Sequence, residues 1–184
     1  MGTTPTTVEE LLDREQIVAC LHRYTRGVDR HDWELLRTAY HEDAVDDHGN
    51  FIGTRDEFVT WVEQFHSQHV RHQHSITNIT IDLDGDVAHT ESYYFVTMQF
   101  PDDSVPLNIN GGRYLDRFEK RDGEWRIAAR LMLNEWQHEA MPTQLAHEQR
   151  RGIKQSGDDA SYQRPLTIRP VSYTHLTLPT IYSV

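Results

Sequence analysis

An aspartate and a histidine near the middle of the chain could together act as a general base. Asp29 comes at the end of a helical pattern, and His74 comes early in a pattern typical of a strand. A carboxylate bonded to one imidazole nitrogen fixes the tautomer and leaves the other nitrogen free to take a proton. We therefore take Asp29 and His74 as the first catalytic candidates. The alternative is that His74 is a surface or structural histidine.

His74 also belongs to a cluster that raises the question of a metal. The chain has 12 histidines, and four of them follow an HxxHxxHxH spacing: His66, His69, His72 and His74. The cluster spans a helix end and a strand start, so its side chains need not converge. No H-E-x-x-H pattern or Cys/His pairing supports zinc. We favour no metal, and a metal site on the cluster is the alternative.

An arginine in the last predicted strand could bind negative charge. By strand alternation, Arg130 lies on the same face as Met132 and Asn134. A buried arginine must pair with an anion or a carboxylate. It could bind a leaving group or a developing enolate. The alternative is a salt bridge to an acid of the sheet such as Glu91.

Other polar residues are placed where they could complete a pocket. Tyr24 lies five residues before Asp29, and its hydroxyl could donate a proton, although a tyrosine in a helix stripe is more often core. Asn108 and Asn110 alternate along a strand. The triplet Asp46, Asp47 and His48 lies in a predicted first strand. We expect one or two members of this triplet to face solvent and one to face the pocket.

Helices are predicted in the first third of the chain. Thr7 with Glu10 resembles a capping box, and so does Thr54 with Glu57. The first box opens a helix whose buried stripe is Ile17, Leu21, Tyr24 and Val28. The second opens a helix that carries Trp61. Asp32 caps a short helix over 33–40, which ends at Tyr40.

After residue 70 the period changes to that of strands. Strands are predicted over 70–82, 87–100, 107–120 and 124–137, with turns at 84–85, 101–104 and 122–123. Gly111-Gly112 indicates a bulge that bends the sheet. Helices followed by antiparallel strands predict an α+β fold in which a curved sheet wraps around helices and encloses a pocket.

Composition restricts the classes of partner. The formal charge is −11 over 184 residues, which argues against nucleic acid because phosphate binding needs a basic face. The single cysteine, Cys20, suits a reducing compartment. The sequence shows no signal-peptide pattern and no apolar run of membrane-spanning length. We predict a cytoplasmic protein with no membrane partner.

The composition also divides the chain into segments. We predict an N-terminal tail over 1–7, one domain over 8–138, and a polar tail or subunit-wrapping arm over 139–170. The last segment, 171–184, contains no Asp, Glu, Lys or Arg and resembles a translated sequencing adapter. Its alternative is an edge strand, because Thr, Val, Ile and Tyr favour strands.

Three stretches together resemble a known family. They are DREQIVACLHRYTRGVDRHDWELLRTAYHEDAVDDHGNFIGTRDEFVTWV, HSITNITIDLDGDVAHTESYY and GGRYLDRFEKRDGEWRIAAR. Over residues 8–138 the chain resembles the SnoaL-like branch of the nuclear transport factor 2 (NTF2-like) superfamily. That superfamily includes scytalone dehydratase, ketosteroid isomerase, polyketide cyclases, bile-acid dehydratase and hexachlorocyclohexane dehydrochlorinase. The resemblance implies a cone-shaped α+β barrel with a pocket, no cofactor, and a homodimer or homotrimer.

The resemblance also implies roles for individual residues. The Asp–His base of the dehydratases matches Asp29 in the GVD motif and His74 in the HxxxN motif, and the dehydratase tyrosine matches Tyr24. The final-strand arginine of the dehydrochlorinase matches Arg130, but its lysine near the tyrosine position is absent. We expect the substrate to be bound by Asn108, Asn110, Met132, Asn134, Tyr40 and Trp61.

The expected function is therefore a lyase or isomerase that needs no cofactor. It would act on a small, largely apolar molecule, including cyclic ones such as steroid, terpenoid or polyketide fragments. The alternative is a non-catalytic small-molecule-binding protein, or the small subunit of a ring-hydroxylating dioxygenase, which keeps the fold without a catalytic centre.

Overall fold

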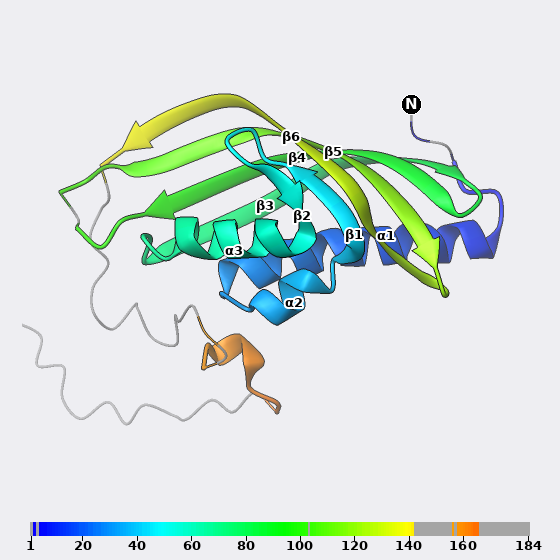
Figure 1. Cartoon of the computed structure of the whole chain (residues 1–184), viewed down its shortest axis with the longest axis horizontal. Helices are drawn as coiled ribbons and strands as arrows, with labels where there is room; N and C mark the ends of the chain where they lie inside the picture. The colour runs from blue at the N-terminus through cyan, green and yellow to red at the C-terminus, as the bar shows by residue number, and fades with distance from the viewer. Residues whose placement is uncertain (1, 3, 103, 142–155, 157, 166–184) are drawn as a thin grey trace, which may run out of the picture.

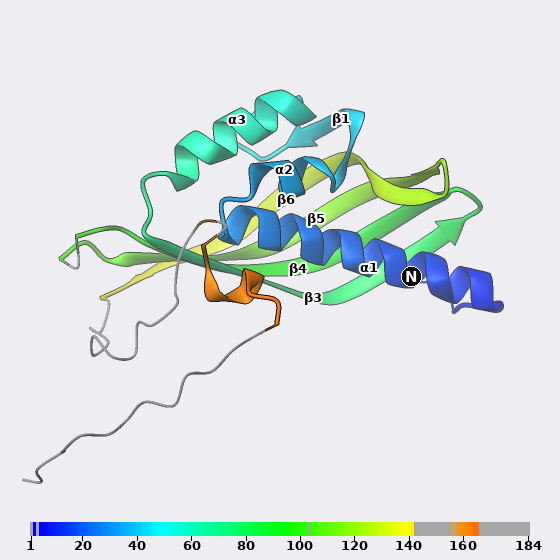
Figure 2. The ribbon, with the colours of Figure 1, turned by 90° about the horizontal axis from the view of Figure 1, so that it is seen from below.

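Three α-helices lie against one face of a curved sheet (Figures 1 and 2). The computed structural model describes residues 2, 4–102, 104–141, 156 and 158–165. The helices are α1 (Val8–Asp29), α2 (Trp33–Arg37) and α3 (Arg55–His66). Within the described part of the chain, no helix is both long and apolar enough to cross a membrane.

The sheet is open and mostly antiparallel. Its strands are β1 (Tyr40–Asp47), β2 (Ile52–Thr54), β3 (Arg71–Asp84), β4 (Val87–Gln99), β5 (Leu107–Arg121) and β6 (Glu124–Ala140). Their order is β2-β1-β6-β5-β4-β3, and only β1 and β6 among these described strands run parallel. The predicted α+β architecture with a curved sheet is confirmed, and the predicted strands correspond to β3–β6. The short β2 was not predicted.

The predicted capping boxes begin both long helices. The Thr7 side chain accepts a hydrogen bond of 3.1 Å from the Glu10 backbone N–H at the start of α1. At α3, the Thr54 backbone N–H donates to Glu57 over 2.9 Å. The stripe of α1 is almost fully buried against the sheet, and it ends with Val28 at 0% exposure. This packing brings Asp29, the last residue of α1, beneath β3.

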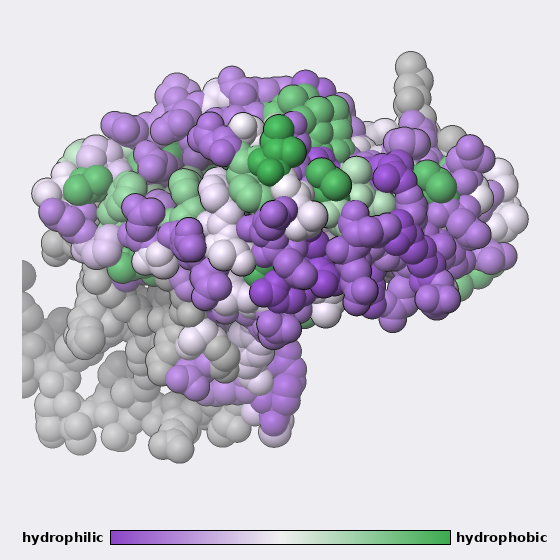
Figure 3. Space-filling model, in the orientation of Figure 1, coloured by the Kyte–Doolittle hydropathy of each residue, from purple (hydrophilic) through white to green (hydrophobic). Residues whose placement is uncertain are grey.

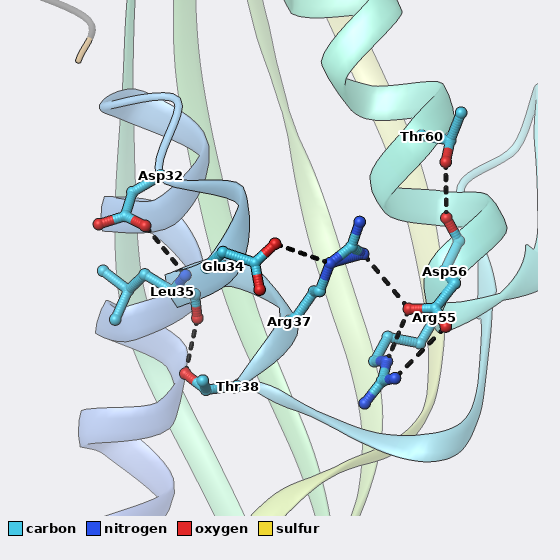
Figure 4. A network of polar contacts seen from close by, with 8 residues as sticks. All are labelled: Asp32, Glu34, Leu35, Arg37, Thr38, Arg55, Asp56 and Thr60. Atoms are coloured by element: carbon cyan, nitrogen blue, oxygen red, sulfur yellow. Dashed lines mark hydrogen bonds and ion pairs between the residues drawn. The ribbon is translucent and has the colours of Figure 1, made fainter. Parts of the chain in front are cut away.

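Polar contacts join α2 to α3 (Figure 4). Arg37 lies 3.3 Å from Glu34 in its own helix and 3.3 Å from Asp56 in α3. The Asp32 side chain caps α2 by accepting a hydrogen bond from Leu35. Ion pairs of this exposed kind contribute about 0–1 kcal/mol each, so they orient the helices more than they stabilise the fold.

Two register shifts between β5 and β6 decide which side chains point inward. The predicted bulge at Gly111-Gly112 is confirmed, because the pairing there moves by one residue. A Cβ on Gly112 would lie 1.9 Å from the Leu133 carbonyl oxygen, so only glycine fits. The second shift, near Ala128, was not predicted. It puts Trp125 on the buried face with Arg130, where simple alternation had placed the two on opposite faces.

Part of the predicted arm over 139–170 folds back on the same chain. Tyr162, in a 3-10 helix (Ala160–Tyr162), donates a hydrogen bond of 3.0 Å to Asp32. Its ring lies under Arg26, and Arg30 pairs with Asp159 at 3.5 Å. The segment therefore covers the end of α1. The prediction about 171–184 lies outside the described residues.

Candidate active site

Asp29 and His74 form a hydrogen-bonded pair. The Asp29 carboxylate lies 2.7 Å from His74 Nδ1 and also accepts a bond of 3.0 Å from the His74 backbone N–H. A carboxylate can only accept, so the Nδ1 nitrogen carries the proton and Nε2 keeps its lone pair. The two side chains are 13% and 6% exposed. The pair therefore has the tautomer and orientation that a general base requires.

His74 lines a cavity of about 310 Å³ between α3 and the inner face of the sheet. This volume is at the lower end of small-molecule sites, which are about 300–1,000 Å³. Its wall combines aromatic rings, methionines and amide side chains. Besides His74 it comprises Tyr24, His48, Asn50, Trp61, Val62, Phe65, His66, Tyr94, Val96, Met98, Asn108, Asn110, Tyr114, Met132, Asn134 and Gln137. Such a wall suits a compact, mostly apolar molecule with a few polar groups.

Two tyrosines separate Arg130 from this cavity. The Arg130 guanidinium lies 4.1 Å from the ring centroid of Tyr24 and 4.0 Å from that of Tyr114. Both tyrosines are almost fully buried, and burial raises the pKa of each hydroxyl well above its usual value. They are therefore neutral hydroxyl groups at physiological pH.

Arg130 itself forms a buried ion pair. Its Nε and Nη2 donate hydrogen bonds of 2.7 and 2.8 Å to the two carboxylate oxygens of Asp116, and both side chains are fully buried. The expected sheet acid is thus present, but it is Asp116 and not Glu91, which pairs with Arg113. Because Arg130 does not line the cavity, any effect of its charge on a ligand would pass through the tyrosine rings.

The histidine cluster forms a line of packed rings beside the cavity. The ring of His72 lies 4.9 Å from that of His31 and 4.4 Å from that of His66, which lies 5.9 Å from His74. Within the described ranges, no group of three or more His, Cys, Asp or Glu is arranged to hold a metal ion. The rings therefore pack as a hydrogen-bonding and aromatic cluster.

Burial keeps two of these histidines neutral. Desolvation lowers the pKa of His72 to about 4, although its hydrogen bond to the Val28 carbonyl acts in the opposite direction. Burial also lowers the pKa of His66 strongly, with the neighbouring histidines adding to the effect. Since a carbonyl only accepts, the 2.9 Å contact means that His72 Nε2 carries the proton. This bond fixes the end of α1 next to Asp29.

A family match agrees with this geometry. The SnoaL-like domain matches residues 9–131, which contain the helices, the Asp29–His74 pair and Arg130. The chain belongs to the SnoaL-like family. An uncharacterized protein of Mycobacterium tuberculosis is 27% identical over 128 residues, which are 68% of this chain and 87% of that protein.

Solved structures similar to this SnoaL-like chain share its NTF2-like fold. A candidate scytalone dehydratase from Novosphingobium aromaticivorans has a TM-score of 0.66 and 23% identity, covering 73% of this chain and 91% of its own. The hexachlorocyclohexane dehydrochlorinase LinA, type 2, has a TM-score of 0.68 and 16% identity, covering 79% and 99%. A Mycobacterium tuberculosis protein of unknown function is 28% identical, with a TM-score of 0.63, covering 73% and 78%. These likenesses establish the fold.

Most of the sequence-predicted residues of the SnoaL-like domain meet at the cavity. Tyr24 and His74 line it, and so do five of the six expected substrate-binding residues: Trp61, Asn108, Asn110, Met132 and Asn134. Tyr40 does not. It is fully buried behind the wall, where its hydroxyl donates a 2.6 Å hydrogen bond to Asp46. Its place at the start of β1, rather than in a helix, points its ring into the core.

Several residues of the cavity were not predicted from the sequence. His66 was considered only as a metal ligand, and Tyr94 and Tyr114 were indistinguishable from core residues in alternating strands. The triplet Asp46, Asp47 and His48 gave the one usable signal for a cavity residue, because Asp46 and His48 are two residues apart. Residues i and i+2 share a strand face, and in the structure His48 lines the cavity while the fully buried Asp46 binds it.

Proposed function

We propose that this protein is a cofactor-independent lyase or isomerase in which His74 removes a proton from carbon. The observation that carries the proposal is the 2.7 Å contact between Asp29 and His74 at the wall of a 310 Å³ cavity. Asp29 holds the tautomer that exposes Nε2 and stabilises the imidazolium that forms. The carbon must be acidified by a neighbouring carbonyl, because imidazole is a weak base.

Neutral hydrogen-bond groups would receive the charge that develops on that carbonyl. The Tyr24 hydroxyl and the amides of Asn108 and Asn134 line the same cavity as His74. Donors that are already oriented in a water-poor site stabilise an enolate more than water does. Arg130, which packs over the Tyr24 ring and is paired with Asp116, would hold Tyr24 in place without touching the substrate.

The cavity favours a small cyclic substrate that carries hydroxyl or carbonyl groups. Aromatic rings and methionines supply the apolar walls. The buried Asn110 side-chain oxygen has no hydrogen-bond partner among the described residues. A ligand hydroxyl would satisfy this acceptor, which otherwise costs about 1–3 kcal/mol.

Removal of the base is the direct test. With a panel of hydroxy- and halo-ketones, wild-type protein should turn over at least one member, and His74→Ala should lower kcat/KM for it by about 10²–10⁴-fold. His89→Ala, at an exposed position of β4, is the matched control and should leave kcat/KM unchanged. Circular dichroism would verify folding. Turnover that survives His74→Ala would refute the mechanism, and ligand binding without any turnover would favour the non-catalytic alternative.

We also propose that the chain forms a homodimer or homotrimer through the outer face of the sheet. Large apolar side chains are exposed there: Tyr93 at 41%, Phe95 at 42%, Leu131 at 38% and Trp136 at 41%. Phe95 and Trp136 contact each other, with ring centroids 5.9 Å apart. Figure 3 shows a patch of hydrophobic side chains near the middle of the upper edge, among mostly hydrophilic ones. Exposed apolar surface that gathers in a patch is typical of protein contacts.

A further inference from the structure

A second carboxylate–imidazole pair contributes to the same cavity. His48 Nδ1 lies 2.8 Å from Asp46 Oδ1, and Asp46 Oδ2 accepts the 2.6 Å hydrogen bond from the Tyr40 hydroxyl. Asp46 is fully buried, and the His48 side chain is 11% exposed. Since His48 lines the cavity together with His74, a ligand there would meet two imidazoles that are each oriented by an aspartate.

The local structure holds His48 in this position. Asp46 points inward near the end of β1, and the chain then turns through Gly49 at a φ of +77°. The His48 backbone N–H donates a 2.7 Å hydrogen bond to the Phe51 carbonyl, which closes the turn. The pair thus rests on a strand end and a closed turn, and the Asp46 contact leaves His48 Nε2 available to a ligand.

Three aromatic rings and a carboxylate surround the His48 ring. Its ring lies 5.0 Å from Phe58, 5.8 Å from Trp61 and 5.9 Å from Tyr114, and aromatic faces attract a cation at such distances. The buried Asp46 carboxylate adds direct attraction. The other charged groups nearby, Asp116 and Arg130, are paired with each other, so their opposing effects largely cancel.

The ring neighbours of His74 are histidines, unlike those of His48. Among the described residues they are the imidazoles of His66 at 5.9 Å and His72 at 6.5 Å. Aromatic faces that can stabilise an imidazolium therefore surround His48, whereas His74 lies among histidine rings that burial keeps neutral.

We propose that His48 is the general acid that protonates the leaving group, which makes the preferred substrate a β-hydroxy carbonyl compound. The inference rests on the function proposed above. His74 Nε2 takes the proton from carbon, and the C–H electron pair forms the new C=C bond. The C–O bond breaks, and its oxygen takes the Nε2 proton of His48 and leaves as water. Solvent then returns a proton to His48 and removes one from His74.

This assignment distinguishes alcohols from halides. Hydroxide is a poor leaving group and needs a proton, whereas chloride leaves as a stable anion. Asp46 and Tyr40 act as positioning residues, because Asp46 binds His48, Tyr40 binds Asp46, and neither of the two lines the cavity. The two imidazoles therefore predict a dehydratase more than a dehydrohalogenase.

Paired probes with one carbon skeleton test the inference. With 3-hydroxycyclohexanone, His48→Gln should lower kcat/KM by about 10²–10⁴-fold. With 3-chlorocyclohexanone, corrected for its spontaneous elimination, the loss should be less than about tenfold, whereas His74→Ala should impair both probes. An equal loss on both probes, or no loss on the hydroxy compound, would overturn the assignment of His48. Absence of wild-type turnover on both probes would count against the proposed function alone.

Discussion

The buried histidines should make the stability of this protein fall steeply in mild acid. In the unfolded chain His66 and His72 take up protons near their ordinary pKa of about 6.5. In the folded chain His72 has a pKa of about 4, and burial holds the pKa of His66 lower still. Below pH 6.5 the unfolded state therefore binds more protons than the folded state. Stability that is fully present at neutral pH is lost as the pH falls through this window.

The size of the effect follows from the width of that window. One pH unit corresponds to about 1.4 kcal/mol for each histidine that stays neutral only in the folded state. Between pH 7 and pH 5 each of the two histidines contributes about 2 kcal/mol, so the pair lowers the free energy of unfolding by about 4 kcal/mol. This is a large part of the 5–15 kcal/mol that is typical of a domain.

Urea titrations at pH 7 and pH 5 measure this loss directly. His66→Leu removes one of the two groups and should reduce the difference in unfolding free energy between the two pH values by about 2 kcal/mol. His89→Gln, which changes an exposed histidine on β4, should leave the difference as in wild type. If His66→Leu loses as much stability as wild type between pH 7 and pH 5, His66 is not held neutral and the reasoning fails.

Two further predictions concern the ion pair and the assembly. Asp116→Asn should destabilise the protein by about 3–5 kcal/mol in urea, because it leaves the Arg130 charge buried without its carboxylate. The exposed-pair control Glu135→Gln should cost about 0–1 kcal/mol, and a comparable cost for both would contradict the burial argument. In size-exclusion chromatography with light scattering, the wild-type protein should have two or three times the mass of one chain. The Trp136→Glu variant should have the mass of a single chain. A monomeric wild type would exclude this interface.

Local signals in the sequence were sufficient to predict the elements of the fold. The capping boxes at Thr7 and Thr54 begin helices that the structure confirms, because a cap is decided by a few neighbouring residues. Alternation and Asp-Gly turns likewise delimit the long strands. The short β2 and the parallel pairing of β1 with β6 depend instead on contacts between distant segments, and no local pattern indicates them.

The partner of Arg130 shows why the buried ion pair could not be assigned. Simple alternation places Arg130 on one face of β6, but its neighbour on β5 depends on the register of the two strands. The shift near Ala128 sets that register and aligns Arg130 with Asp116. A one-residue slip would have moved every side chain to the opposite face, so the sequence indicated an acid of the sheet as partner but not which one.

The two aspartate–histidine pairs differ in how far the sequence alone determines them. Asp29 and His74 are 45 residues apart, and their contact depends on α1 packing beneath β3, so a family resemblance was needed to connect them. Asp46 and His48 are two residues apart, at the end of β1 and just after it, and continued alternation places them on the same side. What alternation could not determine was which side faces the cavity. That depends on β1 pairing with both β2 and β6, which turns Asp46 toward the fully buried Tyr40 and leaves the adjacent Val45 46% exposed.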